Sequence, residues 1–339
     1  MIDYSVSVII CTVNRGHFLQ YVMDAVSRWQ YSFEELIVVV GPTFDDTEFV
    51  LSEYKSIINK TIFIDQKNVS VARNLGLKAA SGDIIFYLDD DVIPPENWIE
   101  KHLQIHLQQG ANCGCVGGAV IDKTKPLLSL QFDCGVNSLL SESRPVLSAD
   151  AQHDYLSKPD WFRSIMGANA SYKREALVKI GYFDEFFEYF LEETDVCLRL
   201  HQAGYRICNV NAPVEHYVQP SHNRAFAKHM PKAYRQYLTC WYSLAKNTTY
   251  FALKHGFPRI ALPIFTIRLT GLLIYRCLLR ILRLKFTHNI SNYLLFQYIQ
   301  DSIVGVRHGW KAGMKLYNTQ PRKIAEVGIK QSKLMLNGE

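Results

Sequence analysis

Two kinds of hydrophobic pattern alternate along the first ninety residues, and this alternation constrains the fold more than any other feature. Apolar runs rich in β-branched residues predict four strands, at 5–13, 35–41, 61–65 and 83–89. Apolar residues at helical spacing predict three helices between them, at 17–29, 47–58 and 71–80. Strands that alternate with helices are joined by right-handed crossovers. The sequence therefore predicts an α/β fold with a Rossmann-type mixed, mostly parallel sheet and helices on both faces.

Three consecutive carboxylates, Asp89, Asp90 and Asp91, follow the last of these predicted strands. Ligands of such sheets bind beyond the carboxyl ends of the strands, where "TVNRG" (12–16) and "VGPTFDDT" (40–47) also lie. Adjacent carboxylates repel one another, which raises their pKa values unless a cation is bound. Mg²⁺ and Mn²⁺ bind one or two carboxylates together with phosphate oxygens. The triplet therefore predicts a site for a metal and a diphosphate, and the alternative reading is a solvated acidic turn.

Further polar residues are predicted at positions that favour anions. Arg73 and Asn74 lie in the first turns of a predicted helix, where a cation and free backbone N–H groups meet an anion favourably. Asn14 and Arg15 close the first strand in a similar position. His216 follows a short predicted strand, and a lone histidine there is either a ligand or a structural residue.

The middle of the chain is less regular. The pattern predicts a strand at 113–122, whereas residues 123–160 lack periodicity and are expected to form a loop over the site. A helix is predicted from residue 191 to Gly204. At its start, Glu192 and Asp195 share one face and Glu193 is expected to point away from both.

The composition is that of a folded protein: the 339 residues are 48% hydrophobic and 20% charged. Eight irregularly spaced cysteines indicate buried thiols rather than a disulfide framework or a zinc site. The chain begins directly with a strand-like run, without the basic and apolar segments of a secretory signal. A cytoplasmic location is therefore expected.

The charge distribution changes sharply at His216. From His216 to Gln300 there are twelve Lys and Arg residues and no Asp or Glu, a segregation that predicts an anionic partner surface. No uncharged apolar run approaches the ~20 residues needed to span a bilayer. We favour an interfacial helix at 264–285 whose arginines face anionic headgroups, namely Arg268, Arg276, Arg280 and Arg283. The alternatives are a packed helix with solvated arginines and, less favoured, a nucleic-acid surface, for which the aromatic residues fit no known stacking module.

The order of segments between Val6 and His216, and more loosely to Arg259, resembles the inverting, nucleotide-sugar-dependent glycosyltransferases of family 2. The matching segments are "SVIICTVNR", "VSVARNLGL", "SGDIIFYLDDDVIPP", "GANASYKREAL", "GYFDE" and "FLEETDVCLRLHQAGYRI". Each is weak alone, because short acidic motifs are common, but six in this order are highly specific. The resemblance implies the GT-A fold and a Mn²⁺ or Mg²⁺ cofactor.

The resemblance also implies roles for individual residues. Asp89 and Asp91 match the D-x-D motif, in which the first helps to hold the ribose and Asp91 coordinates the metal. Glu193 matches the general base, although the family more often has Asp there. Contact with the donor is implied for Thr12, Asn14, Arg15, Asp45, Arg73, Asn74, Asp89, Asp90 and Asn169. Coordination of the metal is implied for Asp91, Asp89 and His216. A position on the acceptor side is implied for Gly167, Ala168 and Glu192.

One departure from the family pattern concerns the donor base. The second strand commonly ends in a pair of aspartates, one of which contacts uracil, but this chain has Val40 and Gly41 there. Asp45 and Asp46 come later and match a different acidic position. Either the backbone contacts the uracil, or the donor is not a UDP-sugar.

Together these features predict an inverting glycosyltransferase that uses a nucleotide-diphosphate sugar and a saccharide or lipid-linked hydroxyl acceptor, in cell-envelope or exopolysaccharide biosynthesis. A catalytic domain is expected at 1–215, with a nucleotide-binding half at 1–91 and an acceptor half at 92–215. A basic, mainly helical region is expected at 216–339.

A peripheral position at the inner face of the plasma membrane is expected, with no nucleic-acid partner. The alternatives are a nucleotidyltransferase that makes sugar nucleotides, for which "CTVNRGHF" lacks the Gly-rich basic loop, and a non-catalytic carbohydrate-binding protein. The sequence does not specify the sugar, the acceptor, the linkage or the oligomeric state.

Overall fold

A computed structural model describes residues 4–29, 33–125, 129–218, 241–256, 262–288 and 292–319. The chain divides into two compact units. Unit 1 comprises Met1–Asn137, Ser143–Glu188 and Glu192–His222, and unit 2 comprises Ser138–Glu142, Tyr189–Leu191 and Asn223–Glu339.

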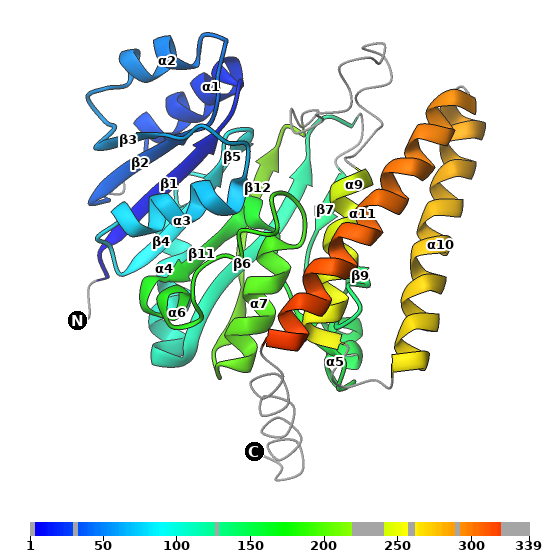
Figure 1. The fold of residues 1–339 in the computed structure, drawn as a ribbon. Coiled ribbons are helices and arrows are strands. Elements are labelled where there is room, and N and C mark those ends of the chain that lie inside the picture. The colour runs from blue at the N-terminus through cyan, green and yellow to red at the C-terminus, as the bar shows by residue number, and fades with distance from the viewer. Residues whose placement is uncertain are drawn as a thin grey trace. The chain divides into compact units, whose positions relative to one another are not determined.

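Unit 1 is built on a nine-stranded mixed sheet (Figure 1) with the strand order β3-β2-β1-β4-β11-β6-β12-β5, in which β7 pairs with β6. Its strands are β1 (Val6–Thr12), β2 (Glu35–Val40), β3 (Lys60–Phe63), β4 (Ile84–Asp89), β5 (Val92–Ile93), β6 (Cys113–Asp122), β7 (Ser129–Phe132), β11 (Ala170–Lys173) and β12 (Arg206–His216). Strands β1 to β4 are parallel, and β11 runs antiparallel between β4 and β6. The predicted α/β class with a mixed, mostly parallel sheet is confirmed.

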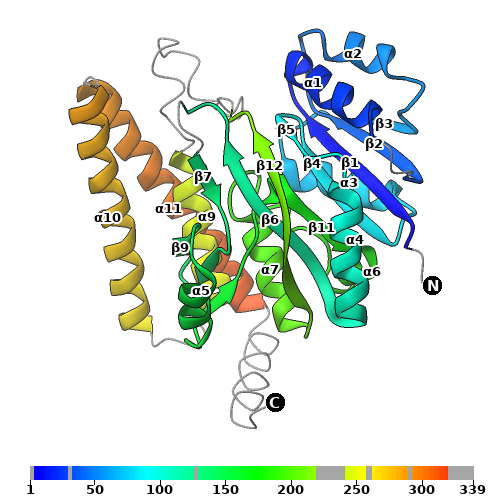
Figure 2. The same ribbon diagram turned by 180° about the vertical axis from the view of Figure 1, so that it is seen from behind.

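Helices cover both faces of this sheet, as Figures 1 and 2 show from opposite sides. The helices are α1 (Gly16–Ser27), α2 (Thr47–Glu53), α3 (Val69–Ala79), α4 (Trp98–Gln109), α6 (Arg174–Lys179) and α7 (Glu192–Gln202), with short 3₁₀ turns at Gly110–Asn112 and Gly167–Asn169. Apolar residues of α1 and α4, such as Leu19 and Leu103, share a buried cluster with Val8 and Phe86. On the other face α3 packs closely on β1: Gly76 of α3 lies so near Ile9 of β1 that any larger side chain at position 76 would collide with Ile9.

The sheet edge that the sequence predicted as a binding edge is formed by parallel neighbours that end together. Thr12 pairs with Val40 at the end of β1 and β2, and Cys11 pairs with Asp89 at the end of β4. Burial on both faces explains why these strands read as continuous apolar runs rather than alternating patterns. The polar residues that follow each strand are therefore brought to one edge.

Residues 123–160 are not the continuous loop that the sequence predicted. They contain β7, β8 (Val136–Ser138), β9 (Ser143–Arg144) and α5 (Ala149–Leu156), and a second sheet has the order β10-β8-β9 with β10 at Trp161–Arg163. Strands of two to four residues are too short to carry a readable period of two, which is why the sequence pattern missed them.

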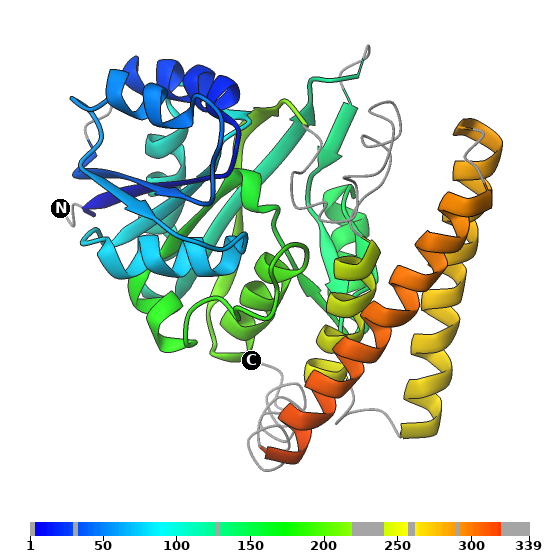
Figure 3. The ribbon, with the colours of Figure 1, turned by 45° about the horizontal axis from the view of Figure 1, so that its top comes forward.

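The described residues of unit 2 from Trp241 onward are helical, with α9 (Trp241–Phe251), a π-helical turn at Ala252–Gly256, α10 (Leu262–His288) and α11 (Asn292–Thr319). α9 and α11 run side by side (Figure 3), and side chains at Gly305 or Gly309 would collide with backbone oxygens of α9. Leu140, Leu253 and Leu269 form a small buried cluster. Among the described helices, none combines the length and the apolar character that crossing a membrane requires.

Candidate active site

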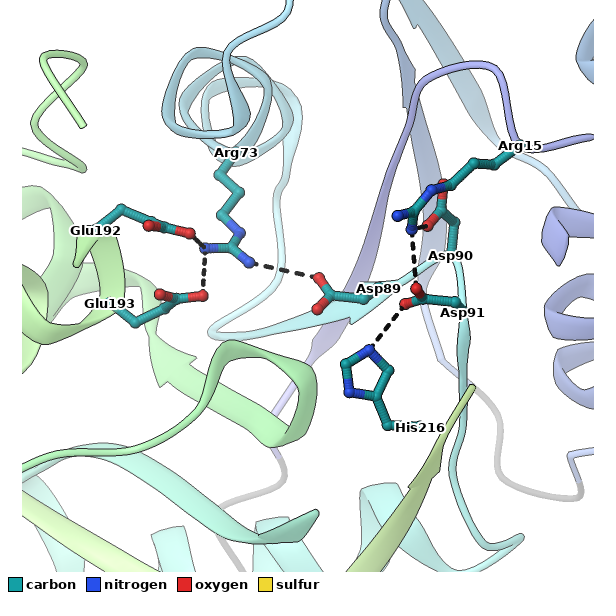
Figure 4. Close-up of polar contacts among 8 residues, drawn as sticks. All are labelled: Arg15, Arg73, Asp89, Asp90, Asp91, Glu192, Glu193 and His216. Carbon is teal, nitrogen blue, oxygen red and sulfur yellow. Dashed lines mark hydrogen bonds and ion pairs between the residues drawn. The ribbon is translucent and has the colours of Figure 1, made fainter. Parts of the chain in front are cut away.

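One group of charged side chains surrounds Arg73 on α3 (Figure 4), and we call it the Arg73 cluster: Arg73, Asp89, Glu192 and Glu193. Nη1 of Arg73 lies 2.9 Å from Oε1 of Glu193 and 3.3 Å from Oε1 of Glu192. Nη2 of Arg73 lies 3.4 Å from Oδ1 of Asp89 at the end of β4. A single guanidinium therefore links carboxylates from two distant parts of the chain.

The guanidinium of Arg73 is fixed from all sides. It is buried, and its Cζ lies 5.7 Å from the ring centre of Tyr87 and 5.5 Å from that of Phe183, within cation–π range. Burial would lower the pKa of Arg73, but the charges of Glu193, Asp89 and Glu192 outweigh burial and raise it. Arg73 is therefore a permanent positive charge with little freedom to move.

The two glutamates at the start of α7 differ in environment. The side chain of Glu192 is 5% exposed and that of Glu193 is 18% exposed. Burial raises the pKa of Glu192 well above its usual value, the charge of Glu193 adds to this effect, and Arg73 only partly opposes it. The environment of Glu192 therefore favours the protonated form of its side chain. The expectation that Glu193 points away from Glu192 is wrong, because both contact the same nitrogen of Arg73 within the first helical turn.

The turn at Gly167–Asn169 closes the Arg73 cluster from a third direction. A side chain at Gly167 would collide with the carboxylate of Glu193 and lie 2.9 Å from Nη2 of Arg73. Only glycine allows this close approach. Ala168 is instead buried in the apolar core of unit 1.

A second group lies at the ends of β1, β4 and β12, and we call it the Arg15 cluster: Thr12, Arg15, Asp90, Asp91 and His216. Nη1 of Arg15 lies 2.7 Å from Oδ1 of Asp90 and 2.9 Å from Oδ2 of Asp91 (Figure 4). The hydroxyl of Thr12 donates to Oδ2 of Asp90. Burial raises the pKa of Asp90 to about 6, although the charge of Arg15 opposes this shift.

His216 is brought to the same edge by the antiparallel pairing of β12 with β5, in which His216 faces Val92. Its Nε2 lies 3.3 Å from Oδ1 of Asp91, and its Nδ1 lies 2.9 Å from Oε1 of Gln131. Burial would lower the pKa of His216, but the hydrogen bond to Asp91 and the negative charge of Asp91 outweigh burial and raise it.

The Asp91–His216 pair fits a divalent cation as part of its coordination shell. No group of three or more His, Cys, Asp or Glu side chains that could hold a metal occurs in the described residues. Two neighbouring ligands of an octahedral ion with bonds of about 2.1 Å lie about 3 Å apart, close to the 3.3 Å between Asp91 Oδ1 and His216 Nε2. Mg²⁺ commonly takes only one or two protein ligands, and phosphate and water complete its shell. Asp89 contacts Arg73, so its carboxylate belongs to the Arg73 cluster.

The side chains of Asn169 and Asn74 are buried and hydrogen-bonded within the protein. Asn169 is fully buried; its Oδ1 accepts from Trp98 and lies 3.0 Å from Nε2 of His102, and its Nδ2 donates to two backbone carbonyls. Asn74 is likewise buried, and its amide bonds to the backbone of Phe183 and the side chain of Glu185. These side chains use their hydrogen-bonding groups to hold the domain together.

Asp45 and Asn14 shape the loops at the sheet edge. The carboxylate of Asp45 accepts from the backbone N–H of Gly16 and from Thr43 and Thr47, which lowers its pKa to about 2 against the effect of burial. Oδ1 of Asn14 accepts from the backbone N–H of Phe44, and Asn14 has the left-handed φ of 52°. At the position of the missing aspartate, a side chain on Gly41 would collide with Val13.

Sequence reasoning missed three residues that support the two clusters. Tyr87 and Phe183 stack on Arg73, and Gln131 orients His216. Tyr87 reads as one more apolar residue of a strand, and Gln131 lies in the segment expected to be a loop. No local signal marks either of them, because their contacts are made by distant parts of the chain.

The fold has a counterpart among solved structures. It is similar to that of GalNAc-T7, solved with UDP, GalNAc and Mn²⁺, with a TM-score of 0.53 and 16% identity. The match covers 64% of this chain and 44% of that one. Unit 1 thus has the GT-A fold.

Sequence relatives point in the same direction. Chondroitin synthase of Escherichia coli is 22% identical over 240 residues, which are 63% of this chain and 34% of that protein. The glucosyl-dolichyl phosphate glucuronosyltransferase of Haloferax volcanii is 23% identical over 62% of this chain and 68% of that protein. The E. coli UDP-Glc:α-D-GlcNAc-diphosphoundecaprenol β-1,3-glucosyltransferase WfgD is 26% identical over 48% of this chain and 69% of that protein. The chain thus spans about a third of the length of chondroitin synthase.

The model described as glycosyl transferase family 2 matches residues 7–181, just over half of the chain. The chain therefore belongs to glycosyl transferase family 2, which confirms the family that the motifs indicated. The match ends before Glu192, so the glutamates of α7 and His216 lie beyond it.

Proposed function

We propose that this protein is an inverting glycosyltransferase that moves a sugar from a nucleotide-diphosphate donor to a hydroxyl acceptor in cell-envelope or exopolysaccharide biosynthesis. The observation that carries the proposal is the meeting of Asp89 and Glu193 on Arg73, next to the Asp91–His216 pair. It brings groups suited to a donor diphosphate and a group suited to an acceptor hydroxyl into one site of a family 2 domain.

Glu193 is the proposed general base. Its side chain is more exposed than that of Glu192, whose pKa is raised by burial well above its usual value. The acceptor oxygen attacks the anomeric carbon from the side opposite the diphosphate, its proton passes to the carboxylate of Glu193, and the bond from carbon to phosphate oxygen breaks. Attack from that side inverts the anomeric configuration.

Asp91 and His216 are the proposed ligands of Mn²⁺ or Mg²⁺, with Asp89 nearby on the donor side. A divalent cation supplies positive charge to the phosphate oxygens of the leaving group. Arg15 holds Asp90 and Asp91 in place, and Thr12 holds Asp90. These residues order the edge of the sheet on which the diphosphate is expected to lie.

The nature of the donor and the acceptor follows from relatives and is proposed on that basis. WfgD is named for UDP-Glc and a diphosphoundecaprenol acceptor, and the H. volcanii relative for a dolichyl phosphate. A lipid-linked saccharide acceptor at the inner face of the plasma membrane is consistent with both. Since Gly41 leaves no room for the usual aspartate, we propose that any contact to the donor base at this position comes from the backbone.

The proposed catalytic domain is 1–215, with a nucleotide-binding half at 1–91 and an acceptor half at 92–215, followed by the basic helical region at 216–339. The proposed binding of a nucleotide donor and a metal is tested by thermal-shift measurements with UDP, GDP, dTDP and CMP, each with and without Mn²⁺. We expect one nucleoside diphosphate to raise the melting temperature only when Mn²⁺ is present. Release of pyrophosphate from a nucleoside triphosphate and sugar phosphate would instead favour a nucleotidyltransferase.

A further inference from the structure

Unit 2 exposes many large apolar side chains on α10 and α11. On α11, Tyr293, Phe296 and Ile303 are more than half exposed, and on α10 the same holds for Ile267, Ile274, Tyr275, Leu278 and Phe286. Large apolar side chains that are exposed in such number on a soluble protein mark an interaction surface. We call these side chains, together with the exposed Arg307, Lys311 and Lys315 of α11, the α10–α11 surface.

The α11 part of this surface has a defined orientation. At about 100° per residue, Gly305, Gly309 and Gly313 share one side of the helix, the side that packs on α9 and on the π-helical turn that follows it. Tyr293, Phe296 and Ile303 fall on the opposite side. The same side continues toward the C-terminus with the exposed Arg307, Lys311 and Lys315. One helix face is thus apolar in its first half and basic in its second.

The α10 part has the same division between a packed and an exposed side. Leu269 is buried against Leu253, whereas Ile267, Ile274 and Leu278 recur at helical spacing on another side of the helix. Of the four arginines that the sequence predicted to face headgroups, Arg268 is exposed. The side chains of the others, Arg276, Arg280 and Arg283, lie outside the described residues.

The charge of these two helices selects the partner. Together α10 and α11 contain eight Lys and Arg residues and one acidic residue, Asp301. A second copy of the chain would bring like charges together, and a nucleic acid would leave the apolar side chains in water. An anionic lipid surface satisfies both properties, since headgroups attract the basic residues and the acyl boundary accepts the apolar ones.

We infer that the α10–α11 surface binds the surface of anionic membranes, with apolar side chains inserted below the headgroups and Arg307, Lys311 and Lys315 held at the headgroup level. The inference concerns unit 2 alone and does not require the proposed sugar transfer. It assigns the anionic partner that the sequence predicted to particular side chains.

The test is cosedimentation of the full-length protein with vesicles of phosphatidylcholine alone and of phosphatidylcholine with 30% phosphatidylglycerol. We expect binding to the anionic vesicles, weakened about tenfold or more by raising the salt from 0.1 to 0.5 M. The double variant Phe286→Gln/Phe296→Gln should lose about tenfold in affinity. The matched control is Phe49→Gln/Phe63→Gln, since Phe49 and Phe63 of unit 1 are 63% and 60% exposed, against 82% and 57% for Phe286 and Phe296; it should bind like the wild type.

A second measurement does not depend on weakened binding. Phe286→Trp should show fluorescence quenching by brominated acyl chains in anionic vesicles, whereas Phe49→Trp should not. Equal losses in both Phe-to-Gln variants, no quenching at position 286, or wild-type protein that stays in the supernatant would each overturn the inference. Self-association abolished by Phe286→Gln/Phe296→Gln, without vesicle binding, would assign the surface to a second copy.

Discussion

The Arg73 cluster and the Arg15 cluster both combine an arginine with carboxyl groups, but they differ in the number of carboxyl groups and in their other side chains. Each contains one arginine, and each draws on the acidic triplet at the end of β4. Arg73 uses two nitrogens to reach carboxylates on separate elements, whereas Arg15 contacts Asp90 and Asp91 through Nη1 alone. His216 completes the Arg15 cluster, whereas two glutamates, one buried and one partly exposed, complete the Arg73 cluster.

This difference teaches how one acidic triplet serves two purposes. Strand β4 ends at Asp89, whose carboxylate joins the Arg73 cluster, whereas Asp90 and Asp91 lie in the turn that follows and join the Arg15 cluster. The Arg73 cluster suits proton transfer, because it holds the partly exposed carboxylate of Glu193 beside a fixed cation. The Arg15 cluster suits a metal and a diphosphate, because its carboxylates lie next to an imidazole.

The largest expected effect tests the division of labour within the Arg73 cluster. Glu193→Gln removes the proposed base and should lower kcat by about 10²–10⁴-fold while leaving donor binding unchanged. Glu192→Gln is the matched control: burial raises the pKa of Glu192 and favours its neutral acid, which the amide resembles, so activity should fall only a few-fold. Transfer rates and nucleotide affinity are measured for both. Equal losses in the two variants would remove Glu193 as the specific base.

The next effect separates the two clusters. Asp91→Asn should lower the affinity for Mn²⁺ in the presence of the donor nucleotide by about 10–100-fold, because a neutral amide is a poorer ligand than a carboxylate. Asp90→Asn, one residue away, loses contacts to Thr12 and Arg15 but no proposed ligand, and should change the affinity for Mn²⁺ much less. Calorimetric titration of Mn²⁺ at a fixed nucleotide concentration measures the affinity for Mn²⁺ in both variants. The metal assignment fails if Asp90→Asn has the larger effect.

A smaller effect compares the two arginines directly. Lysine carries one nitrogen, so Arg73→Lys cannot contact both Glu193 and Asp89, and kcat should fall about tenfold with little change in the KM for the donor. Arg15→Lys can keep its contacts, because both are made by one nitrogen, and its kcat should stay within about threefold of the wild type. Steady-state kinetics with varied donor decide the matter. The reverse order of kcat values would contradict a positioning role for Arg73.

Much of the fold could be predicted because its signals are local. The parallel strands β1, β2 and β4 are long apolar runs, and β6 was predicted with the bounds that the structure has. The short strands β7, β8 and β9 could not be predicted, since two to four residues owe their conformation to the partners across the sheet rather than to their own pattern.

The residue types of the site could also be predicted, but not which side chains meet. The sequence identified Arg73, Asp89 and Glu193 as chemically important, yet only the fold makes Arg73 the shared partner of both carboxylates. Asn169 shows the converse. It lies in a family motif, but its environment in the core makes it a structural residue, and no spacing rule distinguishes the two situations.

The polar network around Asn169 extends the comparison to a site without charge, and here the expected effect is on stability rather than activity. His102 on α4 lies within hydrogen-bond distance of Asn169 and Ser171, and burial lowers the pKa of His102 to about 3. Above pH 6.5 the side chain is neutral in both the folded and the unfolded state, and its contribution to stability is complete. As the pH falls from 6.5 toward 3, the unfolded state binds a proton that the folded state does not. At pH 5 this difference lowers the free energy of unfolding by about 2 kcal/mol.

His102→Gln removes this titration, so the loss of stability between pH 7.5 and pH 5 should be about 2 kcal/mol smaller than in the wild type. Urea unfolding at the two pH values measures it, and the pH difference is informative even if the variant is less stable throughout. His106, whose pKa burial also lowers to about 3, remains in the variant and preserves part of the dependence. An unchanged pH difference would mean that His102 is solvated and charged in the folded protein. Because neither histidine contacts either cluster, kcat at pH 7.5 should not change in the variant. That result would separate this network, which supports the fold, from the two clusters proposed to carry the chemistry.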